Sequence, residues 1–242
     1  MGEPGAMGTT LIFTAVVQLL LVLLSISAHE AAHAWVADRC GDSTARLLGR
    51  VSLNPLRHLD PFGSVLLPLL LAGLPLLSPM LQVPVFGWGR PPLVLARNLR
   101  RPYWNSLMVS AAGPAVNLLL AGLATIAVGF AAAAIGADAR KAALATLVYQ
   151  IDGGTGRLAG FPLMFTLVRL ATINAFLAVF NLLPLPPLDG GQIALQTLPA
   201  DWAEKLASLR PYGLMIGMAL AMLWVVPLLV LPFHFILLLV IN

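Results

Sequence analysis

Charged side chains are scarce in this 242-residue chain: only 10% of its residues are charged, whereas 59% are hydrophobic. A soluble domain carries about 25% charged residues to cover its surface. So small a charged fraction excludes a soluble globular protein, and long apolar runs take the place of charge. The chain therefore belongs in a lipid bilayer, and we expect an all-α membrane protein.

Cysteine and lysine are also rare, with Cys40 as the single cysteine and 2 lysines beside 12 arginines. One cysteine excludes an intramolecular disulfide. The net charge is only +4, and the arginines fall mostly between the apolar runs rather than along one solvated stripe. That distribution is typical of residues that flank membrane spans, and it does not favour nucleic acid as a partner.

Five apolar runs reach the length of about 18 residues that a membrane-spanning helix requires. The segment before the first run holds Glu3 and no Lys or Arg, unlike a signal peptide, so we expect the first run to be kept as a helix. The last run contains Pro227 and Pro232 and forms either one kinked helix or two short ones. We expect a polytopic bundle of about five to six transmembrane helices in a single domain, 1–242. The runs are 11–37, 61–81, 106–135, 161–183 and 212–241.

Two loops hold most of the arginines, and their order conflicts with a simple alternating topology. Residues 39–60 contain four arginines, and residues 90–101 contain four more. Consecutive loops alternate sides of a membrane, whereas arginine-rich loops favour one side. Either the intervening segment does not fully cross, or one loop folds back onto the membrane surface.

Residues 82–102 are apolar but crowded with proline and glycine, which a membrane-spanning helix does not tolerate. We expect a re-entrant or interfacial β-like loop, whose backbone must be satisfied by protein or by a water-filled cleft. Two polar stretches, 136–157 and 199–210, are expected to be surface connections. The second is expected to contain a short interfacial helix with Trp202 at the level of the headgroups.

A His-Glu-Ala-Ala-His motif, residues 29–33, directly follows the apolar run 11–28. On a helix, histidines four residues apart project from one face, so His29 and His33 can offer two nitrogens to one Zn²⁺ while Glu30 acts as a base toward water. Ionisable groups at membrane depth are costly without a partner, and a metal cation supplies one. The alternative is that the histidines bond between helices and that Glu30 pairs with an arginine.

A catalytic zinc site needs three protein ligands and an open fourth position, so a third ligand must come from elsewhere. Asp189 is the candidate, in the stretch 181–191 at the end of the fourth run. Three prolines there end the helix, and we expect Asp189 to be held on an unwound segment facing the interior. The alternative is an ordinary carboxylate at a helix end, but its apolar neighbours leave such a group little to neutralise it.

Together these stretches resemble the site-2 protease family of intramembrane zinc metalloproteases. The family's HExxH motif matches His29, Glu30 and His33, and its NxxPxPxxDG motif matches residues 181–190. The family's GPxxN element resembles residues 113–117, and residues 49–61 are similar to a stretch of compact prokaryotic members. We expect neither a PDZ insertion nor a CBS-type tail. The motif-bearing segments are expected at about 11–37, 106–135 and 161–192.

The resemblance implies that His29, His33 and Asp189 bind one Zn²⁺ per chain and that Glu30 exchanges protons during hydrolysis of a peptide bond. It implies that Asn117 assists, either by donating to the developing oxyanion or by holding the substrate. A membrane asparagine can also simply hold helices together. The expected substrate is a transmembrane protein of a prokaryotic plasma membrane. A transporter or metal-handling protein with the same cluster is the alternative.

Hydrolysis inside a membrane places two demands on the fold. Water must reach the metal, and Ser27, Asn174 and Asn181 are candidate linings of its channel. The substrate must also leave its helical state, because a helical amide is shielded by its own turn. We expect the loop 82–102 to pair with the unwound substrate as the edge of a sheet would.

Overall fold

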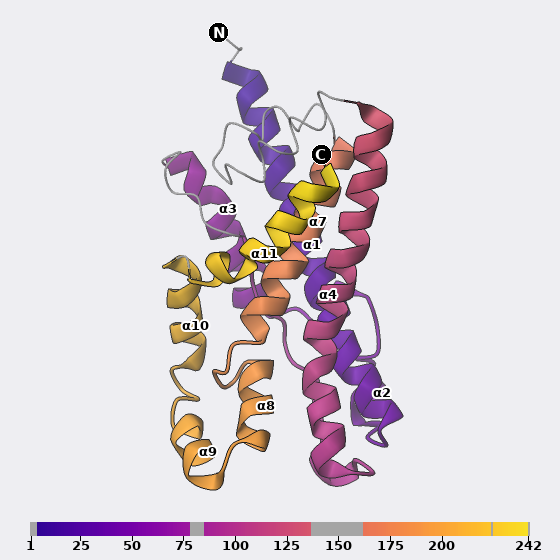
Figure 1. The fold of residues 1–242 in the computed structure, drawn as a ribbon, viewed down its shortest axis with the longest axis vertical. Helices are drawn as coiled ribbons and strands as arrows, with labels where there is room; N and C mark the ends of the chain where they lie inside the picture. The colour runs from indigo at the N-terminus through magenta and orange to yellow at the C-terminus, as the bar shows by residue number, and fades with distance from the viewer. Residues whose placement is uncertain (1–3, 78–84, 137–161, 224, 242) are drawn as a thin grey trace.

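Three long helices form the body of the molecule, as the computed structural model shows in Figure 1. α4 packs against both of the others, and all regular secondary structure in the described residues is helical, as expected of an all-α membrane protein. The three helices are α1 (Pro4–Arg39), α4 (Pro102–Ile135) and α7 (Pro162–Asn181). The structure describes residues 4–77, 85–136, 162–223 and 225–241.

The same three helices are long and apolar enough to span a bilayer, over Ile12–Arg39, Pro102–Ala134 and Pro162–Asn181. Shorter apolar helical stretches accompany them in the described part of the chain. These shorter stretches fall below the about 20 residues that cross a hydrocarbon core, so a total of five to six spans stays a prediction. They are Pro61–Leu74, Gly213–Met222 and Leu228–Ile241.

The last apolar run folds as two helices, α10 (Gly213–Met222) and α11 (Val225–Ile241). In one continuous helix the ring of Pro227 would clash with the carbonyl group of Leu223, four residues earlier. A new helix that begins at Val225 puts Pro227 in its first turn, where the missing N–H has no partner to lose. Of the two alternatives for this run, the chain therefore adopts two short helices.

The two arginine-rich loops lie at one end of the bundle and contact each other. The backbone N–H of Arg100 donates to the carbonyl oxygen of Cys40 at 2.9 Å, and the Asn105 side chain donates to the same oxygen at 3.2 Å. The segment between the loops therefore returns to the side from which it starts. This arrangement agrees with the alternative in which that segment does not fully cross.

A buried carboxylate, that of Asp42, holds this loop contact together. It accepts hydrogen bonds from the backbone N–H of Leu95 at 2.6 Å and from the side chains of Asn98 at 3.0 Å and Thr44 at 2.5 Å. Burial by itself raises the pKa of Asp42, but these bonds outweigh burial and hold the pKa below its ordinary value. The carboxylate therefore stays ionised and fixes the loop that leads into α4.

The described part of the Pro/Gly loop, residues 85–101, forms no β-strand, so the β-like character expected of it is limited there to backbone bonds along one edge. One edge of the loop is bonded to the residues before α3 (Leu67–Leu77): Trp88 N–H donates to Gly63 O at 3.2 Å, and Arg90 N–H donates to His58 O at 2.8 Å. No second strand pairs with the described loop on its other edge. Residues 82–84 of the predicted loop and 137–157 of the first predicted surface connection lie outside the described residues.

Short helices complete the fold. The helix predicted around Trp202 is confirmed as α9, and Lys205 lies over the exposed Trp202 ring at 5.4 Å from its centroid. This pair suits an interface between water and lipid. The short helices are α2 (Thr44–Leu47), η1 (Pro55–Arg57), η2 (Pro61–Leu66), η3 (Ala96–Asn98), α8 (Asp189–Thr197) and α9 (Ala200–Ala207).

Candidate metal centre

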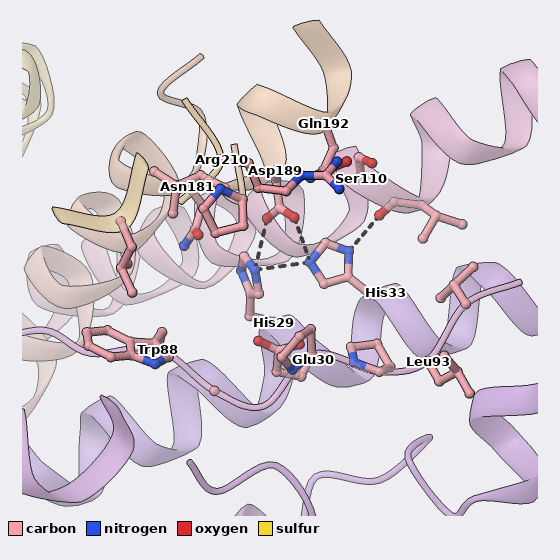
Figure 2. Close-up of a pocket in the computed structure, with 18 residues that line it drawn as sticks. His29, Glu30, His33, Trp88, Leu93, Ser110, Asn181, Asp189, Gln192 and Arg210 are labelled. Atoms are coloured by element: carbon pink, nitrogen blue, oxygen red, sulfur yellow. Dashed lines mark hydrogen bonds and ion pairs between the residues drawn. The ribbon is translucent and has the colours of Figure 1, made fainter. Parts of the chain in front are cut away.

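Two histidines on α1 and one aspartate at the start of α8 converge on a single point. His29 Nε2 lies 3.0 Å from Asp189 Oδ2, His33 Nε2 lies 3.3 Å from Asp189 Oδ1, and the two Nε2 atoms are 3.1 Å apart. Figure 2 shows the three side chains pointing toward one another. The fold thus brings together all three residues predicted as ligands, although 156 positions separate His33 from Asp189 (189 minus 33).

Asp189 is the first residue of α8, whereas the sequence led us to expect it on an unwound segment. α7 ends at Asn181, and the unwound stretch is residues 182–188, which hold the prolines. Helix formation resumes at the carboxylate because a negative charge is stabilised in the first turn of a helix. Gly190 and Gly191 permit this sharp restart, since a Cβ on either would collide with the backbone of the unwound stretch.

Hydrogen bonds behind His29 fix which of its nitrogens carries the proton. Asn174 donates from Nδ2 to the carbonyl oxygen of Leu170 at 2.9 Å, so its Oδ1 is the atom that accepts from Asn117 Nδ2 at 2.8 Å. The oxygen of Asn117 must then face His29, where Oδ1 lies 2.5 Å from Nδ1. Because an amide oxygen can only accept, His29 Nδ1 donates, and Nε2 is left with a free lone pair.

His33 is fixed in the same tautomer by a different group. Its Nδ1 lies 2.6 Å from the carbonyl oxygen of Val109 on α4, and a carbonyl oxygen can only accept. His33 Nε2 therefore also presents a lone pair. Both imidazoles direct these lone pairs at each other and at the Asp189 carboxylate. Three acceptors therefore face one another without a donor, an arrangement that favours a cation between them.

The donor set fits a zinc ion by its geometry as well as its chemistry. Two ligands at about 2.0 to 2.1 Å in a tetrahedral zinc site are about 3.3 Å apart, close to the 3.0, 3.1 and 3.3 Å found here. Asp189 Oδ2 is buried and has no aligned hydrogen bond in the described chain. A Cβ on Gly113 would lie 2.5 Å from His29 Nε2 and at least as close to His33 Nε2, so this glycine leaves the central space open.

A cavity of about 600 Å³ opens onto this cluster. Glu30 lines it, is 7% exposed, and has one carboxylate oxygen, Oε2, without a hydrogen-bond partner among the described residues. In Figure 2 Glu30 lies on the side of the imidazoles away from Asp189, toward the loop that holds Trp88 and Leu93. The carboxylate predicted as a base therefore belongs to the cavity lining and keeps one oxygen without a partner among the described residues.

The other residues predicted from sequence lie around this centre in different ways. Asn117 is fully buried and contacts His29 and Asn174, and it does not line the cavity. Of the three residues predicted to line a water channel, Asn181 lines the cavity, whereas Ser27 and Asn174 are buried away from it. The sequence placed Gly113 in the GPxxN-like element without giving this glycine a role, and its proximity to the imidazoles comes from the packing of α4 on α1.

Comparison with known proteins agrees with this geometry. The profile of Peptidase family M50 matches residues 17–224, which include all three clustered residues and Glu30. The chain belongs to this family, that of the site-2 proteases. This M50 peptidase is an intramembrane zinc metalloprotease, and nothing in the comparisons supports the transporter alternative.

Individual relatives carry names of the same kind. The chain is 35% identical over 205 residues to "Putative zinc metalloprotease YwhC" of Bacillus subtilis, an alignment that covers 84% of this chain and 78% of that protein. It is 31% identical over 205 residues to Rip2 of Mycobacterium tuberculosis and 27% identical over 202 residues to Rip2 of Mycolicibacterium smegmatis. Each of these two alignments covers 82% of the present chain but only 63% of the Rip2 protein. No solved structure matches the chain.

Gly113→Ala should lower the zinc content of the M50 peptidase to less than about a tenth of one ion per chain, because the added methyl group fills the space between the imidazoles. Gly122→Ala is the matched control on the same helix, since a Cβ there meets no atom within 4 Å. Both changes favour the helix by about 1 kcal/mol. Metal analysis of the purified variants, with circular dichroism to verify folding, tests the assignment; equal zinc in both would contradict it.

Proposed function

We propose that this M50 peptidase hydrolyses a peptide bond in or near a transmembrane segment of a membrane protein, with His29, His33 and Asp189 as the ligands of one zinc ion. The observation that carries the proposal is the meeting of two Nε2 atoms and a carboxylate, within 4.8 Å of one another, near the end of a membrane-capable helix. Zinc, when bound, supplies a Lewis acid and lowers the pKa of water to about 7.

Glu30 is proposed as the general base and acid of the reaction. Glu30 lines the cavity, and its buried Oε2 has no hydrogen-bond partner among the described residues, so we propose that this carboxylate takes a proton from water and returns it to the amine that leaves. Because Glu30 belongs to the same helix as both histidines, its position relative to them is set by one helical turn. A rigid helix keeps such a group within hydrogen-bond reach of a reacting molecule better than a loop does.

Asn117 is proposed as a positioning residue for His29. Its Oδ1 holds the Nδ1 proton of His29, and its Nδ2 is already used in the bond to Asn174. That bond uses one of the two N–H groups of the amide, and Asn117 does not line the cavity, so we do not assign it a bond to an oxyanion. Its contribution is to keep His29 in the tautomer whose Nε2 lone pair points at the centre. Hydrogen-bond partners of metal-binding histidines commonly have this function.

The substrate is proposed to lie as an extended chain between the Pro/Gly loop and the start of α8. Residues from both segments line the cavity, among them Gly89 and Leu93 on one side and Leu188 on the other. The backbone N–H groups of Trp88 and Arg90 donate hydrogen bonds to carbonyl oxygens within residues 58–63. In an extended chain, the backbone N–H of the residue between them points to the opposite side, toward the cavity edge of the loop. An unwound substrate can pair with that free edge.

The protein is proposed to be a multi-pass protein of a prokaryotic plasma membrane, with the arginine-rich end of the bundle in the cytoplasm. The connection between α4 and α7 starts and ends at the opposite end of these helices and contains three basic and two acidic residues, Arg140, Lys141, Arg157, Asp138 and Asp152. Arginine is retained on the cytoplasmic side of membranes. The seven arginines at the proposed inner end are Arg39, Arg46, Arg50, Arg57, Arg97, Arg100 and Arg101.

Glu30→Gln should abolish cleavage of a model transmembrane substrate while about one zinc per chain remains, because general acid–base catalysis contributes about 10² to 10⁴ in rate. Asp189→Ala and His33→Ala should lose both zinc and cleavage. Metal analysis beside a cleavage assay in proteoliposomes separates these cases. Full cleavage by Glu30→Gln would contradict the proposed reaction. So would an unmodified protein that transports metal across the vesicle membrane and does not cleave the substrate.

Asn117→Leu should weaken zinc affinity by about 10- to 100-fold, the usual effect of removing a partner behind a metal-binding histidine. Asn117→Gln keeps an amide but places it one methylene group further from the backbone, so we expect this variant to recover little of the lost zinc affinity. The zinc dissociation constant, measured by competition with a chelator, is the direct readout. An unchanged zinc affinity combined with a large loss of kcat would instead favour a role for Asn117 in contact with the substrate.

A cysteine introduced at Leu47, an exposed position of α2 at the arginine-rich end, tests the orientation. In a background where the buried Cys40 is replaced by Ala, we expect a membrane-impermeant maleimide to label it in inverted vesicles and not in intact cells. Labelling of intact cells would place the arginine-rich end outside and contradict the proposal. The exposed Leu163, near the start of α7 at the opposite end, is the matched position for a cysteine with the opposite expected pattern.

A further inference from the structure

One side of the catalytic cavity carries a positive charge that the proposed chemistry does not use. Arg210 lies between α9 and α10, is exposed, and lines the cavity. Of the described residues that line this cavity, it is the one with a permanent positive charge, and within the described chain no carboxylate forms an ion pair with it. The other two residues with full charges that line the cavity, Glu30 and Asp189, are acidic.

Two further hydrogen-bond donors lie near Arg210. Gln192 is one turn after Asp189 on α8, and Ser110 follows Val109 on α4; both line the same cavity. Neither side chain has a hydrogen-bond partner among the residues that the structure describes. In Figure 2 these two residues and Arg210 gather on the side of the centre where α8 begins, across from Glu30. The remaining cavity lining is mostly apolar.

We infer that Arg210, assisted by Gln192 and Ser110, binds a carboxylate of the peptide substrate on the α8 side of the scissile bond. The inference rests on the proposed function and names the substrate class: a membrane peptide with an acidic group near the cut. A guanidinium group matches a carboxylate with two parallel hydrogen bonds, and an amide and a hydroxyl can add two more donors. Arg210 is thus a specificity-determining residue.

The charges around the centre explain why the acidic group belongs beside Arg210 and away from the scissile bond itself. Glu30 would repel a second carboxylate placed next to it, whereas Arg210 attracts one, and both effects are stronger in a cavity with apolar walls than in water. Two sources supply the same chemistry: an Asp or Glu side chain of the substrate, and the carboxylate of its C-terminus.

The experiment compares the zinc-loaded full chain with Arg210→Gln and Arg210→Glu in proteoliposomes of neutral lipid. One transmembrane substrate is made in a series in which Asp, Asn or Lys occupies each position on both sides of the cut, with its C-terminus either free or amidated. Lys205→Gln is the matched control, because Lys205 is a cation on α9 that does not line the cavity. The readouts are kcat/KM for each substrate and zinc per chain.

At one position the unmodified protein should prefer Asp over Asn by about tenfold in kcat/KM, mainly through KM, a factor that corresponds to about 1.4 kcal/mol. Arg210→Gln should remove the preference, Arg210→Glu should turn it toward Lys, and Lys205→Gln should keep it, with unchanged zinc throughout. A preference that follows only the free C-terminus would identify the terminal carboxylate as the source, and one that follows Asp would identify the side chain.

Several results would overturn the assignment to Arg210. One is an Asp preference that survives in Arg210→Glu; another is a Lys205→Gln variant that loses the preference equally. Loss of zinc in the Arg210 variants would indicate a structural role. Cleavage of the whole series by the unmodified protein without any acid preference would overturn the inference and leave the proposed function intact. Failure of the zinc-loaded protein to cut any substrate would instead refute the proposed function.

Discussion

The close approach of three hydrogen-bond acceptors, a set that a cation could neutralise, governs how the helices of this protein are arranged. His29, His33 and Asp189 direct two nitrogen lone pairs and a carboxylate at one point, with separations of 3.0 to 3.3 Å. Unpaired acceptors buried at such distances repel one another and lose their hydration. A divalent ion held by these three residues would offset that cost, and its binding would then stabilise the fold.

The surrounding helices are arranged to keep those lone pairs pointing inward. The proton of His33 is held by a backbone carbonyl of α4, and that of His29 is held by an amide on α4 that is itself fixed by α7. α4 also brings Gly113 to the one place where a side chain would close the site. The packing of α4 against both α1 and α7 therefore sets the protonation, direction and free volume of the centre.

The cavity joins this rigid centre to less regular segments. Residues of α1 line one part of the cavity. The rest of its lining includes residues of the Pro/Gly loop, of the unwound stretch 182–188, and Arg210. Extended and unwound backbone is acceptable at this depth only where protein or water satisfies it, and the loop meets that condition along one edge through residues 58–64. Segments of this kind can accept a substrate chain that has itself left the helical state.

Composition, periodicity and motif spacing were enough to predict the membrane environment, the helical class and the residue types of the centre. His29 and His33 share a face wherever their segment is helical, because a helix repeats every 3.6 residues. The sequence also determined that the prolines after Asn181 end a helix. It did not determine that a new helix begins at Asp189, because that restart depends on two glycines fitting against the backbone of residues 182–186.

Which distant groups meet depends on how the helices and loops pack in three dimensions. The two arginine-rich loops lie together because Asp42 and Cys40 bond residues 95–105, a pairing with no local pattern. Asn174, expected in a water channel, instead bonds Asn117, and Arg210 reaches the cavity from a turn with no motif of its own. Periodicity and chain stereochemistry act within a few residues, whereas these contacts arise from helix packing across more than 50 positions.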